Sequence, residues 1–95
     1  MNRSFSQNND ILTIVLDGRL DTATFAQLEN VISKNYSGGS IVIDCKKLEY
    51  VSSAGLRVLL AAQKKTKGSL KLTGVSELVM EVFEITGFVD ILVIE

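Results

Sequence analysis

The chain of 95 residues contains no histidine, no proline and no tryptophan, and it has a single cysteine. Without histidine, a Ser-His catalytic arrangement is impossible. One cysteine with scattered carboxylates does not match the ligand set of a zinc site. Cys45 cannot form an intramolecular disulfide, and we interpret it as a small buried hydrophobic residue. These absences argue against an enzyme or a metal protein, and they predict no cofactor.

Long apolar runs and clusters of one charge are also missing. Ten Lys plus Arg face eleven Asp plus Glu, so the net charge is −1, and nothing in this balance favours binding to nucleic acid. No apolar stretch approaches the roughly 20 residues that cross a bilayer. The first ten residues, MNRSFSQNND, lack the apolar run of a signal peptide. We therefore expect a protein of the reducing cytoplasm, without insertion into a membrane.

What the chain does contain is an alternation of strand and helix patterns along its whole length. We expect residues 1–95 to form a single α/β domain. The order β, β, α, β, α, β, α, β implies right-handed crossovers and a small, mostly parallel sheet of about five strands, with three flanking helices and an antiparallel first edge. The expected strands are 4–7, 10–17, 40–45, 69–74 and 88–95, the expected helices are 22–36, 53–67 and 76–86, and a turn is expected at Asn8-Asn9.

Some details of these elements follow from local patterns. Residues 46–51 are expected to be a connection between a strand and a helix. Ser76 is expected to cap the third helix and Gly87 to end it. The glycine pair 38–39 lies between a helix and a strand, which is the wrong order for a nucleotide-binding loop. The residues expected to face the core from the third helix are Leu78, Val79, Val82 and Phe83.

The segment EYVSSAGLRVLL, residues 49–60, places two serines where an apolar strand passes into a helix. A hydroxyl on Ser53 would lie at the positive end of the helix dipole, where an anion such as phosphate is favoured by about 0.3 to 1 kcal/mol. Gly55 leaves the backbone open to close approach. Alternatively, Ser52 or Ser53 serves only as an N-cap, which is worth about 1 kcal/mol.

The string LEYVSSAGLRVLL, with IVIDC before it and GRLDTATFAQLE upstream, resembles the STAS domain, the module of bacterial anti-sigma factor antagonists. The resemblance covers residues 4–94. The family carries a D-S-[ST]-G-L signature at the start of a helix, and a partner anti-sigma factor that is also a kinase phosphorylates its serine. Residues 18–21 match the early G-[ER]-L-D element, and residues 86–88 match the late [ST]-G-[FL] element.

By this resemblance Ser53 is the phosphoacceptor. Ala54 stands where the signature has serine or threonine, and Ser52 stands where it has aspartate. The lost carboxylate implies either altered contacts with a kinase or no phosphorylation. The resemblance also implies a docking surface for the partner, hereafter the predicted docking surface. It consists of Gly18, Arg19, Leu20, Asp21, Ser52, Ser53, Ala54, Gly55, Leu56 and Arg57.

The resemblance implies a partner-switching function. The unmodified protein would bind an anti-sigma factor/serine kinase and release the sigma factor. Phosphorylation would end this binding, because a phosphate adds about −1.5 to −2 charge to a packed contact. Arg57 would then pair with the phosphate, or it is only a solvated cation. The alternative function is a STAS adaptor without phosphorylation, in another signalling complex or a lipid-transport complex, and Ser52 favours this alternative.

Two aspartates have two interpretations each. Asp44 either faces the helix start at Ser53 or accepts backbone hydrogen bonds at the end of its strand. Asp21 either caps the first helix or contacts the partner. A monomer and a weak dimer are both compatible with the sequence.

Overall fold

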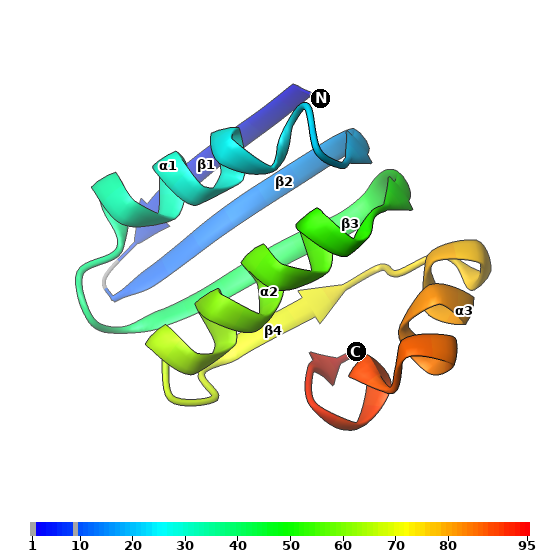
Figure 1. Cartoon of the computed structure of the whole chain (residues 1–95). Helices are drawn as coiled ribbons and strands as arrows, with labels where there is room; N and C mark the ends of the chain where they lie inside the picture. The colour runs from blue at the N-terminus through cyan, green and yellow to red at the C-terminus, as the bar shows by residue number, and fades with distance from the viewer. Residues whose placement is uncertain (1, 9) are drawn as a thin grey trace.

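The described residues of the computed structural model are 2–8 and 10–95, with side chains described from Asp10 onward. These ranges contain one mixed sheet and three α-helices, as predicted (Figure 1). The strands are β1 (Asn2–Asn8), β2 (Ile11–Leu20), β3 (Ser40–Val51), β4 (Leu70–Thr73) and β5 (Val93–Ile94), and the helices are α1 (Phe25–Asn35), α2 (Ser53–Lys65), α3 (Glu77–Thr86) and the short 3₁₀ helix η1 (Phe88–Asp90).

The strands lie in the order β1-β2-β3-β4-β5. β1 pairs antiparallel with β2, with Ser4 opposite Val15, which confirms the antiparallel edge. The other four strands are parallel, and the register runs from Ile14 through Ile43 to Leu72. The predicted turn at Asn8-Asn9 includes Asn9, which is outside the described residues.

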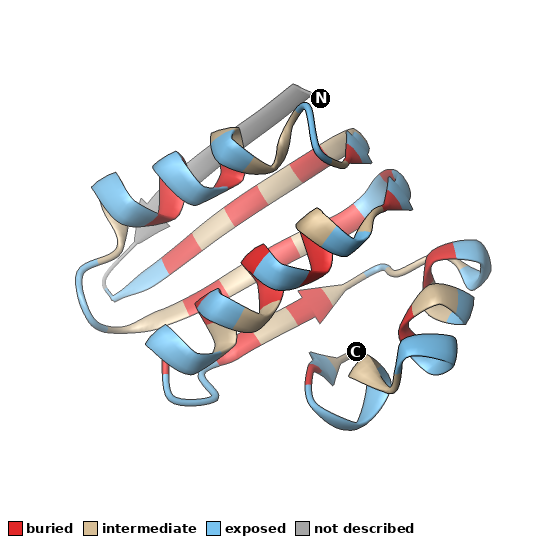
Figure 2. Cartoon of the chain, in the orientation of Figure 1, coloured by how far each residue is buried: buried red, intermediate tan, exposed pale blue. Residues whose placement is uncertain are grey.

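One face of the sheet carries the core. Alternate residues of β2 and β3, such as Leu12, Ile14 and Ile43, are at most 1% exposed, and α1 and α2 cover them (Figures 1 and 2). This alternation follows from the period of two in a strand, which sends successive side chains to opposite faces. α3 packs instead against β3 and η1. No helix in the described part of the chain is both long enough and apolar enough to cross a membrane.

β3 is longer than predicted, because residues 46–51 extend the strand. After a shift in register, this part of β3 pairs with the end of β2, with Gly18 opposite Leu48 and Leu20 opposite Val51. Leu48 and Val51 are only 2% exposed. The prediction of a connection was therefore wrong, because Lys46, Lys47 and Glu49 interrupt the apolar pattern of the strand and its partner strand lies far away in the sequence.

The first helix starts later than predicted, at Phe25. The N–H groups of Thr24 and Phe25 both donate to the Asp21 carbonyl, at 3.1 and 2.8 Å, so a turn precedes the helix. The last strand is shorter than predicted. Gly87 ends α3 in the left-handed conformation, as expected, and the chain then forms η1 before the two residues of β5.

The third helix places one predicted core residue in solvent. Ser76 caps α3 as predicted, since its Oγ accepts from the Val79 N–H at 3.2 Å. Val79 and Phe83 are buried, whereas Leu78 is 67% exposed. Val82 is half-buried and packs against the core, as predicted. The prediction for Leu78 was wrong because α3 packs against β3 along one side only, which leaves Leu78 in solvent.

Candidate functional site

The two serines at the junction of β3 and α2 have different positions. Ser52 is the N-cap of α2, and its Oγ accepts from the Gly55 N–H at 3.3 Å. Ser53 is the first residue of the helix and is exposed. Its hydroxyl forms no side-chain hydrogen bond with another residue that the structure describes. The cap is therefore made by Ser52, which leaves the Ser53 hydroxyl accessible at the positive end of the helix.

The start of α2 lies against the end of β2. The Ser52 N–H donates to the Leu20 carbonyl oxygen at 2.9 Å. At Gly55 the backbone approaches so closely that an added Cβ would lie 2.7 Å from the Leu20 oxygen and 2.8 Å from Leu20 Cγ. Gly55 therefore permits the close contact between the start of α2 and Leu20, the last residue of β2.

The expected strand ended at residue 17, but β2 continues through Gly18, Arg19 and Leu20. A register shift at Gly18 and Arg19 accompanies the positive φ of Gly18, 92°. Such an irregularity bends a strand near its end and redirects the side chains that follow. The segment is therefore held by the sheet, and Asp21 is the first residue beyond it.

Asp21 organises the turn between β2 and α1. Its Oδ1 accepts from the Ala23 N–H at 3.0 Å, and its Oδ2 lies 3.2 Å from Arg19 Nε. The Thr24 hydroxyl lies 3.1 Å from Asp21 Oδ1. The hydrogen bond from Arg19 is the main cause that lowers the pKa of Asp21, with smaller contributions from Thr24 and Ala23 and with partial burial opposing them. The carboxylate is thus a structural part of this turn.

Tyr50 is a member of the site that the sequence interpretation missed. Arg19 pairs with Tyr50 across the β2–β3 ladder, and its guanidinium lies 4.3 Å from the ring centroid. This is within the range of a cation–π contact. Tyr50 is 40% exposed, and it lies three residues before Ser53. An aromatic residue just before the serine pair was the available signal in the sequence.

The predicted docking surface contains both exposed and buried residues. Arg19, Ser53 and Arg57 are exposed, and Gly18, Asp21, Ser52 and Ala54 are half-buried. Leu20, Gly55 and Leu56 are buried, so they support the surface from beneath. Contact of these residues with a partner stays a prediction.

Asp44 and Cys45 lie in the middle of β3. Asp44 Oδ1 accepts from the Lys46 N–H at 3.0 Å. Asp44 is seven residues before the end of the strand, roughly 23 Å from it, so it does not face Ser53. Burial, with a smaller effect of Asp44, raises the pKa of the Cys45 thiol to about 12. The described residues contain no cluster of three or more side chains suited to a metal ion.

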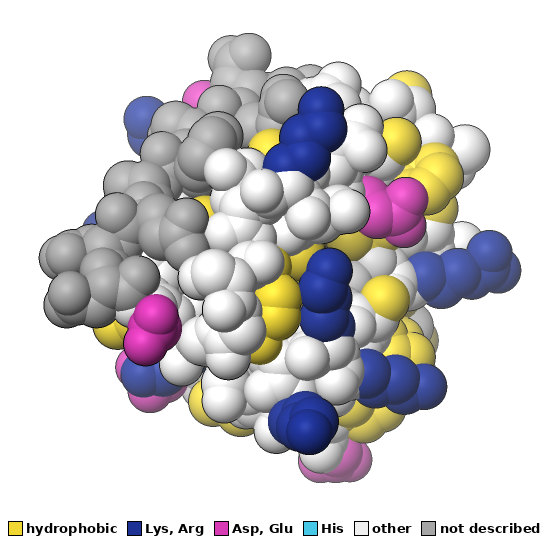
Figure 3. Space-filling view, turned by 90° about the vertical axis from the view of Figure 1, so that its left-hand side faces the viewer, with side chains coloured by type: hydrophobic (Ala, Val, Ile, Leu, Met, Phe, Trp, Pro, Cys, Tyr) yellow, Lys and Arg dark blue, Asp and Glu magenta, His cyan; other side chains and the backbone are white. Residues whose placement is uncertain are grey.

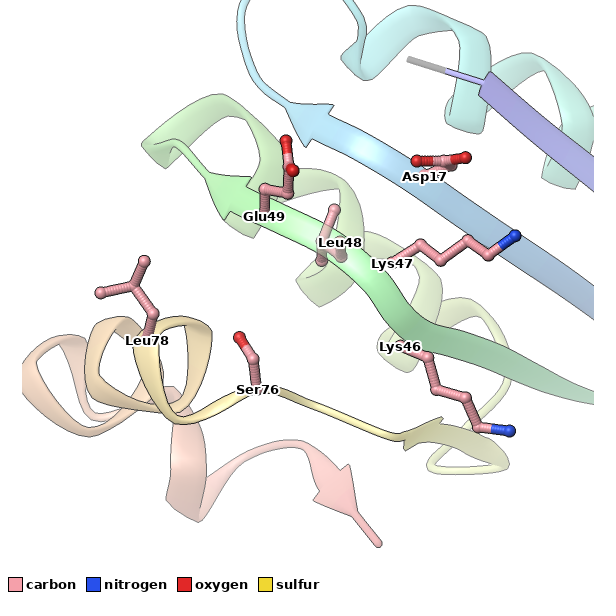
Figure 4. A pocket seen from close by; sticks show the side chains of 7 residues that line it. All are labelled: Asp17, Lys46, Lys47, Leu48, Glu49, Ser76 and Leu78. Carbon is pink, nitrogen blue, oxygen red and sulfur yellow. The ribbon is translucent and has the colours of Figure 1, made fainter.

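A separate hollow, which Ser53 does not line, is shown in Figure 4. β3 and the start of α3 form its walls, and charges of both signs line it. The face in Figure 3, the left-hand side of Figure 1, shows separate lysine and arginine side chains, with aspartate and glutamate side chains also scattered over it. The residues that line the hollow are Asp17, Lys46, Lys47, Leu48, Glu49, Ser76 and Leu78.

Comparisons with known proteins agree with this architecture. The family model described as "Mlab, STAS domain" matches residues 4–94. The BtrV protein of Bordetella bronchiseptica is 35% identical over 96 residues, covering 96% of this chain and 83% of the relative. The anti-sigma-B factor antagonist of Bacillus subtilis is 32% identical over 96 residues, covering 97% of this chain and 88% of the relative.

Among solved structures, the anti-sigma factor antagonist SpoIIAA in its unphosphorylated form has a TM-score of 0.83 and 20% identity, covering 99% of this chain and 88% of that one. The Bacillus cell fate determinant SpoIIAA in its phosphorylated form has a TM-score of 0.67 and 18% identity, covering 99% and 91%. At these identities the structures show the shared fold.

Proposed function

This chain belongs to the STAS domain family, and from that premise we propose that it acts as an anti-sigma factor antagonist. Its activity would be binding to an anti-sigma factor that is also a serine kinase. The name of the Bacillus subtilis relative supports this function, because that protein is aligned over nearly the whole of this chain.

The observation that carries the proposal is the exposed hydroxyl of Ser53 beside the end of β2. Because Ser52 makes the capping bond, a phosphate on Ser53 would leave that bond in place. The backbone bond between Ser52 and Leu20 also ties the start of α2 to the end of β2, where Arg19 and Asp21 form their ion pair. The position is thus suited to a modification that changes a surface without unfolding a helix.

Phosphorylation of Ser53 would end binding through charge. A phosphate adds about −1.5 to −2 charge, and like-charge contacts in an interface cost several kcal/mol. At about 1.4 kcal/mol per decade, this lowers the affinity by about 10²-fold or more. Arg57 lies one turn beyond Ser53, is exposed, and forms no ion pair within the described residues, so it is available to the phosphate.

Purification of the chain from its own cells, with mass spectrometry of the bound protein, identifies the partner. Titration calorimetry with that purified protein then compares Ser53→Ala with Ser53→Asp. We expect Ser53→Ala to bind like the unmodified chain and Ser53→Asp to bind at least about tenfold more weakly. Ser33→Asp, an exposed change on α1, is the matched control. Equal affinities of the two Ser53 variants would contradict the switch.

The second candidate is an adaptor without phosphorylation, and Ser52 in place of the family aspartate favours it. A phosphate-transfer assay with the purified partner separates the two functions. We expect incorporation at Ser53 in the natural chain, and faster incorporation in Ser52→Asp. Modification of Ser52→Asp without any modification of the natural chain would support the adaptor.

A further inference from the structure

An apolar groove runs between the end of β3 and one side of α3, with a volume of about 240 Å³. Its apolar residues are unusually open to solvent: Ile85 is 85% exposed, Leu78 67% and Tyr50 40%. Exposed large apolar residues that lie together mark surfaces for interaction. The residues that line the groove are Glu49, Tyr50, Leu78, Val79, Glu81, Val82 and Ile85.

α3 has two apolar stripes: one is buried in the core, and the other reaches the core only through the half-buried Val82. Val79 and Phe83 are at most 1% exposed and face inward. Leu78, Val82 and Ile85 follow one another at i, i+4 and i+7, which places them on one side of the helix, toward the groove. This second stripe runs from Leu78 to Ile85, seven helical steps that cover about 10 Å along the helix axis, or two turns. A single helix of a partner could cover that length.

Carboxylates border the groove on both sides. Glu49 lies on the side of β3 and Glu81 on the side of α3, and Glu77 and Glu84 continue the row along α3. The ion pairs within the described residues are Arg19–Asp21 and Lys71–Glu95, so none of these four glutamates is paired. α3 itself contains no lysine or arginine. The rim is therefore complementary to a basic segment.

The groove is continuous with the predicted docking surface. Tyr50 lines the groove, and Arg19 of that surface lies over the Tyr50 ring at 4.3 Å. Ser53 follows Tyr50 by three residues. A protein that contacts Ser53 would therefore have the groove within reach.

We propose that this groove binds an amphipathic helical segment of the same partner protein that docks at Ser53, a segment with an apolar stripe flanked by lysine or arginine. This inference rests on the proposed function for the identity of the partner. A second copy of the chain is a poorer occupant, because its own row of glutamates would meet the acidic rim.

The test uses the full chain and the purified partner found through its binding to the natural protein. Calorimetry compares Leu78→Ser, Ile85→Ser and Glu81→Lys with the natural chain. We expect each variant to bind the partner at least about tenfold more weakly than the natural chain. For Glu81→Lys, the affinity should also depend less on salt concentration. Circular dichroism checks folding, which these exposed positions should preserve. The matched controls are Ile11→Ser, at the start of β2, and Glu29→Lys, exposed on α1; both should bind within about twofold.

A photoreactive amino acid in place of Ile85 identifies the segment directly. We expect cross-links to an apolar peptide of the partner with flanking basic residues. Groove variants that bind normally while Ser53→Asp binds weakly would overturn the groove and leave the proposed function intact. If the groove variants bind the partner weakly while Ser53→Asp binds it as tightly as the natural chain, the result would support the groove and contradict the switch. Cross-links to a second copy of the chain would overturn the inference.

Discussion

The two adjacent serines at the start of α2 have different roles. Ser52 satisfies a backbone N–H of α2, while Ser53 contributes an exposed hydroxyl. An aspartate at position 52 could make the same cap, since serine and aspartate are both good N-cap residues. The difference between them is therefore one negative charge next to Ser53, which affects recognition by a kinase more than it affects the helix.

Arg19 also acts at the scale of single residues, through the charge of Asp21. We expect Arg19→Gln to raise the pKa of Asp21 toward its ordinary value of 3.8, because the main cause of its lowering is lost. A carbon-detected NMR titration of the Asp21 carboxyl group measures this. Arg57→Gln, at an exposed arginine that forms no ion pair in the described part of the chain, is the control and should leave the titration unchanged.

The lowered pKa of Asp21 has a consequence for stability. Since the pKa is lower in the folded state, the ionised Asp21 carboxylate stabilises the fold above pH 3.8. This stabilisation is lost as the pH falls through the lowered pKa. The difference in urea midpoint between the natural chain and Asp21→Asn should therefore shrink as the pH falls below about 4. A difference that stays constant from pH 7 to pH 2 would contradict this account.

At the scale of elements, the contact between α2 and β2 depends on Gly55. In a helix, alanine is favoured over glycine by up to about 1 kcal/mol. Here the added Cβ would lie 2.7 Å from a backbone oxygen, and overpacking typically costs about 1 to 3 kcal/mol. We expect Gly55→Ala to lower the free energy of unfolding by about 1 to 2 kcal/mol, as measured by urea denaturation.

Ser53→Ala, in the same helical turn, is the control for Gly55→Ala. Its side chain is exposed, so its effect should stay within about 0.5 kcal/mol. A Gly55→Ala variant more stable than the natural chain would show that helix propensity outweighs the close contact.

At the scale of the whole molecule, Cys45 reports on the integrity of the core. It is 1% exposed, and burial raises the pKa of its thiol to about 12. Since the thiolate is the reactive form, we expect a thiol reagent such as DTNB to modify Cys45 only when the fold opens. Lys64→Cys in a Cys45→Ser background, with an exposed thiol, should react at once. Rapid modification of native Cys45 would contradict the packing of β3.

The order of elements was predictable because it depends on residues close together in the sequence. The mixed sheet, the cap at Ser76 and the left-handed glycine at position 87 all follow from patterns within a few residues. The errors arose where distant segments meet. Residues 46–51 are a strand because β2 lies beside them, and Leu78 is exposed because only one side of α3 packs against β3.

The candidate site shows the same division. Its serines could be located from the sequence, because a helix start is a local feature. Tyr50 was missed, because its contact with Arg19 forms only when β2 and β3 pair.

The sequence by itself determined the kind of most elements and the presence of a hydroxyl at a helix start, because hydrophobic periodicity and capping act within a turn or a few residues of strand. Tertiary structure alone decided which of those residues meet. Burial of apolar surface joins distant segments, so the Gly55–Leu20 contact, the Arg19–Tyr50 pair and the apolar groove beside α3 exist only in the folded chain.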